Sequence, residues 1–245
     1  MRLLPTLGFS HVDLVALVER PPAHLEALAA SGLIVSCGAI GRQLPEDTTL
    51  DAAAVPLRRA ALEQVERQIL DIARLGGTCA YVVPGKDTTF PALARFSEAC
   101  ALLADYAAGC GVRLCIEHSP RTALPTAAAT LGLLERIGHA NLGLLLDLGH
   151  CLLSREDPAG VVSAAGRRVF YVHLDDNDGV SDLHWPLLTG RLSEEMLRGM
   201  LAALSEQKYA GGLALELRAE NAEPAEALRR GRELVVGILK GIWAQ

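Results

Sequence analysis

The sequence is poor in aromatic residues, which make up 4% of its 245 positions, and it contains no long apolar segment. No stretch approaches the roughly 18 to 20 consecutive apolar residues that cross a bilayer, so no membrane association is expected. The first fifteen residues have no cationic segment leading into a long apolar run, and they match a secretory signal peptide poorly. We therefore expect a soluble, cytoplasmic protein.

Concentrated positive charge is also scarce. Acidic residues outnumber basic ones by 29 to 23, the formal net charge is -6, and lysine occurs only at Lys86, Lys208 and Lys240. Arginines form isolated pairs and no basic run. Proteins that grip a nucleic-acid backbone usually present a basic face, so a nucleic-acid partner is not expected.

The six cysteines lack C-x-x-C spacing and fall mostly in apolar segments, which favours reduced thiols inside the core. With 50% hydrophobic and 21% charged residues, the chain is too apolar to stay disordered. Its length is ample for a large buried core.

Short apolar runs alternate with longer amphipathic runs along the whole chain. Several short runs are apolar throughout, which is typical of parallel strands covered on both faces. Strands are predicted at residues 11–15, 33–39, 79–83, 112–117, 142–147, 169–174 and 212–216. Helices are predicted at residues 56–75, 91–108, 126–137, 157–165, 193–206 and 223–238. Gly76 and Gly77 end the first of these helices, and Ser193 caps the fifth.

This β-α order runs on without a linker rich in Pro, Gly or Ser, which predicts a single α/β domain over residues 1–245. Neither G-x-G-x-x-G nor a P-loop is present, which disfavours an open nucleotide-binding sheet. Polar residues instead follow the ends of successive strands, where (β/α)8 barrels keep their active sites. We therefore predict a (β/α)8 TIM-type barrel.

The predicted strands number about seven, whereas a complete barrel of this type has about eight. The barrel is therefore expected to lack or abbreviate its first β-α unit. The two flanking strands, at residues 11–15 and 212–216, would then have exposed edges, which natural proteins usually cover. A symmetric partner is expected there, most simply in a homodimer.

Four late strands each end in a potential metal ligand: Glu117, Asp147, His173 and Glu216. A carboxylate at the end of an apolar strand is costly unless something compensates it. Any one of these groups alone could simply cap the following helix. Four in succession would converge on one point of a closing sheet. Three carboxylates and one imidazole suit a divalent ion of the Mn, Mg, Co or Zn type.

Further polar residues follow the same strand ends. His118 follows Glu117, and His150 comes three residues after Asp147. Asp176 lies just beyond His173, and His184 follows a little later. His150 lies on the same rim as Asp147, and we predict that His118, Asp176 and His184 contact the substrate.

The segments CIEHSPRT, LLDLGH and YVHLDDND, followed by LALE, resemble the xylose isomerase-like TIM barrel superfamily. The resemblance covers about residues 7–233. This superfamily includes sugar and sugar-phosphate isomerases and epimerases, inosose dehydratases, hydroxypyruvate isomerases and type IV AP endonucleases (AP endonuclease family 2). The resemblance implies that the four strand-end residues bind one divalent ion, with Mn²⁺ foremost. It also implies that Glu117 and Glu216 form the acid–base pair and that His150 contacts substrate oxygens.

Such a centre predicts an isomerase or epimerase of a small sugar, sugar phosphate or keto-cyclitol. One carboxylate would remove a proton beside a carbonyl, the second would return it, and the ion would stabilise the enediolate between. A lyase or dehydratase acting on a keto-sugar or inosose is the nearest alternative. An AP endonuclease-like nuclease and a catalytically silent barrel subunit are the less favoured alternatives. In the sugar 3-epimerases of this superfamily an arginine follows the strand histidine by six residues, but Gly179 stands there in this chain.

Overall fold

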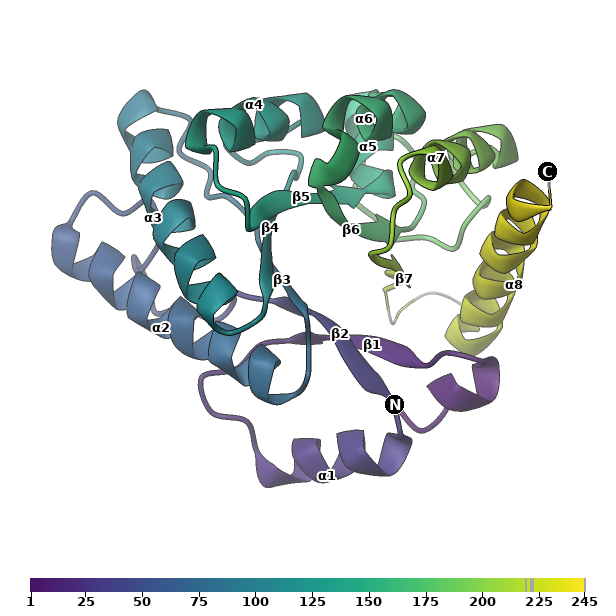
Figure 1. Cartoon of the computed structure of the whole chain (residues 1–245), viewed down its shortest axis with the longest axis horizontal. Coiled ribbons are helices and arrows are strands. Elements are labelled where there is room, and N and C mark those ends of the chain that lie inside the picture. Colours follow the sequence, from purple (N-terminus) through teal and green to yellow (C-terminus); the bar gives the residue numbers. More distant parts are fainter. Residues whose placement is uncertain (219, 221–222, 245) are drawn as a thin grey trace.

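The computed structural model of this chain describes residues 1–218, 220 and 223–244. Within them, seven parallel strands form a nearly closed barrel with eight α-helices outside it (Figure 1). The strands are β1 (His11–Val15), β2 (Ile34–Ala39), β3 (Cys79–Val82), β4 (Arg113–Glu117), β5 (Leu142–Asp147), β6 (Val169–Leu174) and β7 (Gly212–Leu215). The helices are α1 (Pro22–Ser31), α2 (Val55–Arg74), α3 (Phe90–Gly109), α4 (Ala127–Ile137), α5 (Leu148–Ser154), α6 (Pro158–Ala165), α7 (Glu194–Glu206) and α8 (Pro224–Trp243). Two short 3-10 helices, η1 (Leu4–Leu7) and η2 (Gly166–Arg168), complete the regular structure.

The strands follow one another around the sheet in sequence order, and each pairs in parallel with the next. This arrangement confirms the predicted TIM-type barrel of about seven strands. Among the described residues, β1 and β7 do not pair with each other, so the wall is open between them. β3 and β5 are buried along their whole length, whereas every residue of β7 is only half-buried.

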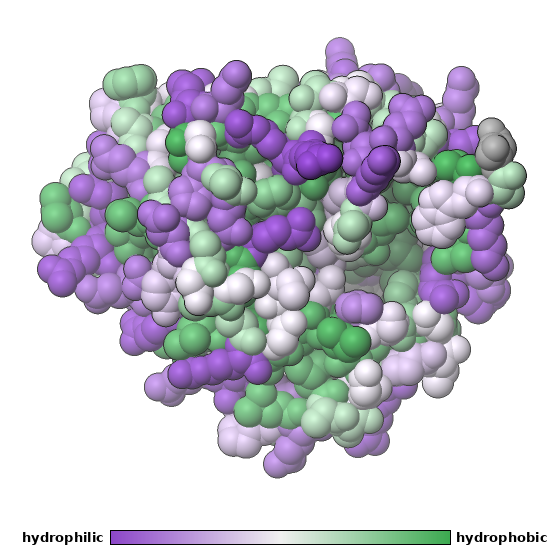
Figure 2. All heavy atoms as spheres, viewed as in Figure 1, coloured by the Kyte–Doolittle hydropathy of each residue, from purple (hydrophilic) through white to green (hydrophobic). Residues whose placement is uncertain are grey.

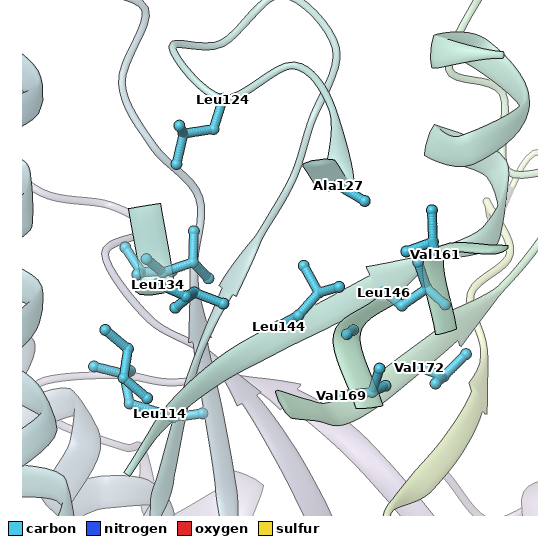
Figure 3. Packing of buried hydrophobic residues seen from close by; sticks show 14 of the residues in the cluster. Leu114, Leu124, Ala127, Leu134, Leu144, Leu146, Val161, Val169 and Val172 are labelled. Atoms are coloured by element: carbon cyan, nitrogen blue, oxygen red, sulfur yellow. The ribbon is translucent and has the colours of Figure 1, made fainter. Parts of the chain in front are cut away.

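Two apolar layers line the two faces of the wall, because alternate strand residues point to opposite sides. One set packs outward against the helices and includes Leu114, Leu144, Leu146 and Val172 (Figure 3). The other set fills the barrel interior with mostly small side chains: Cys37, Ala39, Cys79, Tyr81, Cys115, Leu145 and Tyr171. Strands buried on both faces explain why the sequence showed continuous apolar runs.

The helices bury one face each against this wall. α2 buries Ala61, Val65, Ile69 and Ile72, at the three- and four-residue spacing of an amphipathic helix. At the start of α7 the Ser193 side chain accepts a hydrogen bond from the Met196 N–H, which is the predicted cap. α1 and α5 are helices that the sequence analysis did not predict.

All six cysteines are free thiols, and five of them are buried, as expected for reduced core residues. No helix among the described residues combines the length and apolar character needed to cross a membrane.

The open side of the wall leads into a cavity of about 880 Å³. Both strand edges line it, and α8 contributes apolar side chains, among them Leu228, Val235 and Leu239. Figure 2 shows this region as a hollow beside β7, walled largely by hydrophobic residues. The cavity reaches inward as far as His173 and Glu216, so the open side communicates with the candidate site.

Candidate metal centre

The period of two along each strand places three of the predicted ligands inside the barrel. Glu117 comes two residues after Cys115, Asp147 two after Leu145, and His173 two after Tyr171. The earlier residue of each pair belongs to the interior layer. The ligands therefore stand on top of that layer, at the carboxyl ends of β4, β5 and β6.

The fourth predicted ligand, Glu216, directly follows β7 and donates its backbone N–H to the Leu174 carbonyl at 3.1 Å. Because Asp147 and His173 are register partners and Glu216 extends the next strand, the four side chains meet at one edge of the sheet. One candidate ligand atom from each of the four lies within 4.8 Å of the others.

His173 Nδ1 lies at the middle of this group. It is 2.7 Å from Glu216 Oε2, 3.2 Å from Glu117 Oε1 and 3.8 Å from Asp147 Oδ2. The Glu216 contact has the distance but not the alignment of a hydrogen bond, and both Glu216 Oε2 and Asp147 Oδ2 are buried without a hydrogen-bond partner. Buried polar atoms are normally satisfied, so two orphaned carboxylate oxygens facing one imidazole nitrogen indicate a place for a cation.

Burial and neighbouring charges shift the pKa values of three residues in this group. Burial raises the pKa of Asp147 well above its ordinary range, and the neighbouring Asp175 raises it further. Burial alone would lower the pKa of His173, but the neighbouring carboxylates of Asp13, Glu117 and Glu216 outweigh it and hold the pKa well above its ordinary value. For Glu216, the raising effect of burial is overcome by His173, and its pKa falls to about 2.

A second polar group adjoins the first. Asp147, Asp175 and His184 also bring candidate ligand atoms within 4.8 Å of one another. His184 Nδ1 lies 2.8 Å from Asp175 Oδ2, and its Nε2 lies 3.3 Å from Asp182 Oδ1. Burial lowers the pKa of His184, but Asp175 and Asp182 outweigh this and raise it to about 11.

His150 joins the two groups. Its Nδ1 donates to the His118 carbonyl at 2.7 Å, which turns Nε2 toward Asp182 Oδ1 at 3.6 Å. Burial lowers the pKa of His150, but Asp147 and Asp182 prevail and raise it to about 10. A protonated His150 with Nε2 directed at the rim is placed to donate to an oxygen atom there. The geometry thus brings His150 and His184 to the centre, where substrate contact was predicted.

The other two predicted substrate contacts lie elsewhere. His118 is fully buried behind the centre, where the Asp147 backbone N–H donates to its Nε2 at 3.4 Å. Burial lowers the pKa of His118 to about 3, so the ring is neutral and supports β5 from behind. The structure therefore does not bring His118 to the rim beside His150 and His184.

Asp176 is likewise turned away from the centre. Its carboxylate accepts hydrogen bonds from the backbone N–H groups of Asn177, Gly190 and Leu192, at 2.7 to 2.9 Å. The side chain is thereby committed to fixing the loop before α7. The structure therefore does not bring Asp176 into either polar group, and the neighbouring Asp175 is the residue that reaches the centre.

The predicted set did not include Asp175 or Asp182. The Asp-x-His spacing of Asp182 and His184 was the available signal for one of them. For Asp175 the sequence offered three aspartates within four residues after the strand, Asp175, Asp176 and Asp178, and only the fold shows which one faces the centre.

Comparison with known proteins places this geometry in a family. The family model described as "Xylose isomerase-like TIM barrel" matches residues 10–236, and the chain belongs to that family. The resemblance noted in the sequence is thereby confirmed. No curated protein sequence matches the chain.

Solved structures share the fold at low sequence identity. An L-ribulose 3-epimerase matches with a TM-score of 0.81 and 22% identity, over 99% of this chain and 88% of that one. A D-allulose 3-epimerase from Methylomonas sp. matches with a TM-score of 0.77 and 21% identity, over 97% and 88% of the two chains. A 3-keto-D-glucoside 4-epimerase from E. coli matches with a TM-score of 0.76 and 18% identity, over 96% of this chain and 94% of that one. At these identities the likeness shows the fold.

Proposed function

We propose that this protein is a divalent-metal-dependent isomerase or epimerase of a small sugar, sugar phosphate or keto-cyclitol. The observation that carries the proposal is the convergence of Glu117, Asp147, His173 and Glu216 at the carboxyl end of the barrel. The three similar structures named above are epimerases of ketoses or of a keto-sugar by their names, which supports the same substrate class.

The residues present fit a divalent ion. Three carboxylates and one imidazole form a donor set of the kind that Mn²⁺, Mg²⁺, Co²⁺ or Zn²⁺ accepts, and Mn²⁺ is our first choice. The orphaned oxygens of Asp147 and Glu216 would gain a partner, and the burial that raises the pKa of Asp147 would be offset. A bound ion would polarise the substrate carbonyl and stabilise negative charge that develops on its oxygen.

The chain itself supplies the proton transfers. Glu216, with its pKa lowered to about 2, is ionised at neutral pH and is the proposed base that removes a proton from the carbon beside the carbonyl. Glu117 faces it across His173 and is the proposed partner that returns a proton to the neighbouring carbon or to the opposite face. His150 and His184 are the proposed donors to substrate oxygens.

Product analysis on a substrate panel tests this function. The chelated protein is assayed by NMR against ketoses, ketose phosphates and inososes, before and after Mn²⁺ is added. Exchange of a carbon-bound proton for solvent deuterium that requires the ion is the expected result. Unsaturated or dehydrated products would instead support the lyase, and cleavage of an abasic-site duplex the nuclease. Inertness of the Mn²⁺-loaded protein toward the whole panel would contradict the proposal.

Variants at the two glutamates test their roles. Glu216→Gln and Glu117→Gln should each lower turnover by roughly 10² to 10⁴, the usual cost of losing one proton-transfer group. Both residues are also proposed ligands, so metal content is measured in the same samples. Normal turnover in a metal-loaded variant would remove that glutamate from the acid–base pair.

The proposed assembly is a homodimer in which a second copy covers the open side. Apolar side chains near the edge support it, since Val15 is 46% exposed and Ile34 on the adjacent strand is 54% exposed. Unpaired edges with apolar neighbours invite association. Light scattering at micromolar concentration should therefore give twice the chain mass, and a monomer there would overturn the proposal.

A further inference from the structure

His173 turns its two ring nitrogens toward different groups. Nδ1 faces the carboxylates of Glu117 and Glu216, whereas Nε2 faces Asp13, whose Oδ2 lies 3.7 Å away. When one imidazole nitrogen binds a metal ion, the other carries the hydrogen. An acceptor beside that second nitrogen fixes the tautomer and the orientation of the ring.

Asp13 comes from β1 and reaches the centre through the barrel interior. Its Oδ1 accepts hydrogen bonds from the Tyr171 hydroxyl at 2.7 Å and from the Cys37 backbone N–H at 3.1 Å. The Tyr171 oxygen also lies 2.7 Å from Ser36 Oγ, which anchors it from a second side. These bonds engage Oδ1 and leave Oδ2, a buried atom with no hydrogen-bond partner, beside His173.

Two tyrosine rings restrict the same imidazole. Tyr81 meets His173 edge to face, with centroids 5.3 Å apart and planes at 86°, and Tyr171 does so at 5.8 Å and 90°. The His173 side chain is only 4% exposed. The ring therefore has little room to rotate. Its Nδ1 lies within hydrogen-bond distance of Glu117 Oε1, at 3.2 Å, so an ion bound to Nδ1 would replace that contact, and the acceptor beside Nε2 would hold the remaining hydrogen.

We infer that Asp13 is a positioning residue for the metal centre: it accepts the hydrogen of His173 Nε2 and so presents the Nδ1 lone pair to the ion. The inference rests on the proposed function, because it requires the ion. The separation of 3.7 Å exceeds a normal hydrogen bond of about 2.7–3.2 Å, so Nε2 and Oδ2 should draw together when Nδ1 binds the ion.

The variant Asp13→Asn tests this role. Asn keeps the size of the side chain and an oxygen that can accept from Tyr171 and the Cys37 N–H. Its amide then points N–H toward His173 Nε2, which favours the tautomer that carries hydrogen on Nδ1. Loss of such a supporting partner typically weakens metal affinity by about 10- to 100-fold. The control is Ser36→Ala, which removes the Ser36 contact of the Tyr171 hydroxyl beside the same carboxylate but leaves the contact between Asp13 and His173 in place.

Co²⁺ is the probe, and its dissociation constant is measured by competition with a chelator, together with the thermal midpoint of each apo-protein. We expect wild type and Ser36→Ala to bind with similar affinity and Asp13→Asn to bind about 10- to 100-fold more weakly. Equal affinity of Asp13→Asn and wild type would overturn the inference and leave the metal centre standing. Failure of the wild type to bind Co²⁺ would instead overturn the metal centre of the proposed function, and the inference with it.

A measurement on the wild type keeps the test independent of variant folding. In the ¹⁵N-labelled Zn²⁺ complex, the His173 resonances should show Nδ1 bound to the ion and Nε2 carrying a hydrogen in slow exchange with solvent. Binding through Nε2, or rapid exchange of its hydrogen, would overturn the role of Asp13.

Discussion

Replacing Asp147 with Asn should make the metal-free protein more stable while it abolishes metal binding. The Asp147 side chain is fully buried, and both burial and the nearby Asp175 raise its pKa. Asn has nearly the same shape, and its oxygen can still accept the His150 N–H bond of 2.7 Å at the start of α5. The substitution therefore removes a buried charge without opening a cavity.

The size of the effect follows from the orphaned Oδ2 of Asp147. A buried polar group without a partner costs about 1–3 kcal/mol, and the Asn amide could donate to the surrounding carboxylates. For a protein of this length, about 1 kcal/mol shifts the Tm by roughly 2–4 °C, so a rise of about 2–12 °C is expected. The wild type should gain about 2.7 kcal/mol from an ion at about 100 times its Kd, and the variant should gain almost none of it.

Calorimetry after exhaustive chelation, repeated with Mn²⁺, measures both effects. Asp105→Asn is the matched control, because that carboxylate is 79% exposed and should change neither quantity much. Mn²⁺ should therefore raise the Tm of wild type and leave that of Asp147→Asn nearly unchanged. A lower Tm for the metal-free variant, or an Mn²⁺ shift equal to that of wild type, would refute the reasoning.

Two further predictions concern the second polar group. In Gly149→Ala the new Cβ would lie 2.3 Å from Asp175 Oδ1 and break its 2.8 Å bond to the Gly149 N–H, so thermal stability and turnover should both fall. Gly132→Ala on α4 is the control: its Cβ would meet only an arginine tip at 3.7 Å, and it should be neutral or stabilising by up to about 1 kcal/mol. The pKa of His150 is raised to about 10 and that of His184 to about 11, so the folded state holds their protons more tightly than the unfolded chain does. This stabilisation of the metal-free protein is complete below about pH 6.5 and is lost as the pH rises through those values. Urea midpoints that increase between pH 7 and 10 would contradict it.

The strands and the four-residue centre could be predicted because their signals are local and strong. Strands buried on both faces carry uninterrupted apolar runs, so a charged residue ending such a run stands out. Glu117 and Asp147 are of this kind, and the predicted strand ends agree with the structure to within one residue. The convergence of these ends follows from the parallel barrel, because all the carboxyl termini lie at one rim.

Two helices were missed for physical reasons. α1 buries none of its residues, so no apolar periodicity marks it, and prolines occupy its N-cap and its first position. α5 begins directly after Asp147, whose side chain accepts the His150 N–H as a helix cap while its other oxygen faces the metal centre. A residue that both ends a strand and caps a helix leaves no intervening turn, and the sequence pattern then shows one element where there are two.

The sequence pattern could not predict which way a side chain points once the strand has ended. Asp175 and Asp176 are adjacent and chemically identical, yet the first meets His184 and the second binds loop amides. What separates them is the loop that returns before α7, and its path depends on contacts far apart in the chain. Asp13 was missed for the same reason, since it reaches His173 only because β1 and β6 enclose a common interior.

The open side of the barrel bears directly on the centre. The Asp147 side chain is fully buried and that of Glu117 is 5% exposed, whereas Glu216, beside the gap, is 37% exposed. Asp13, on the other edge of the gap, is 25% exposed. The most exposed of these four groups therefore lie on or directly after the two strands that border the gap. Since charges interact more strongly when water is excluded, any chain that covers this side should tighten the contacts of both groups with His173. The proposed partner, by covering the open side of the wall, would therefore also strengthen the contacts that form the proposed metal centre.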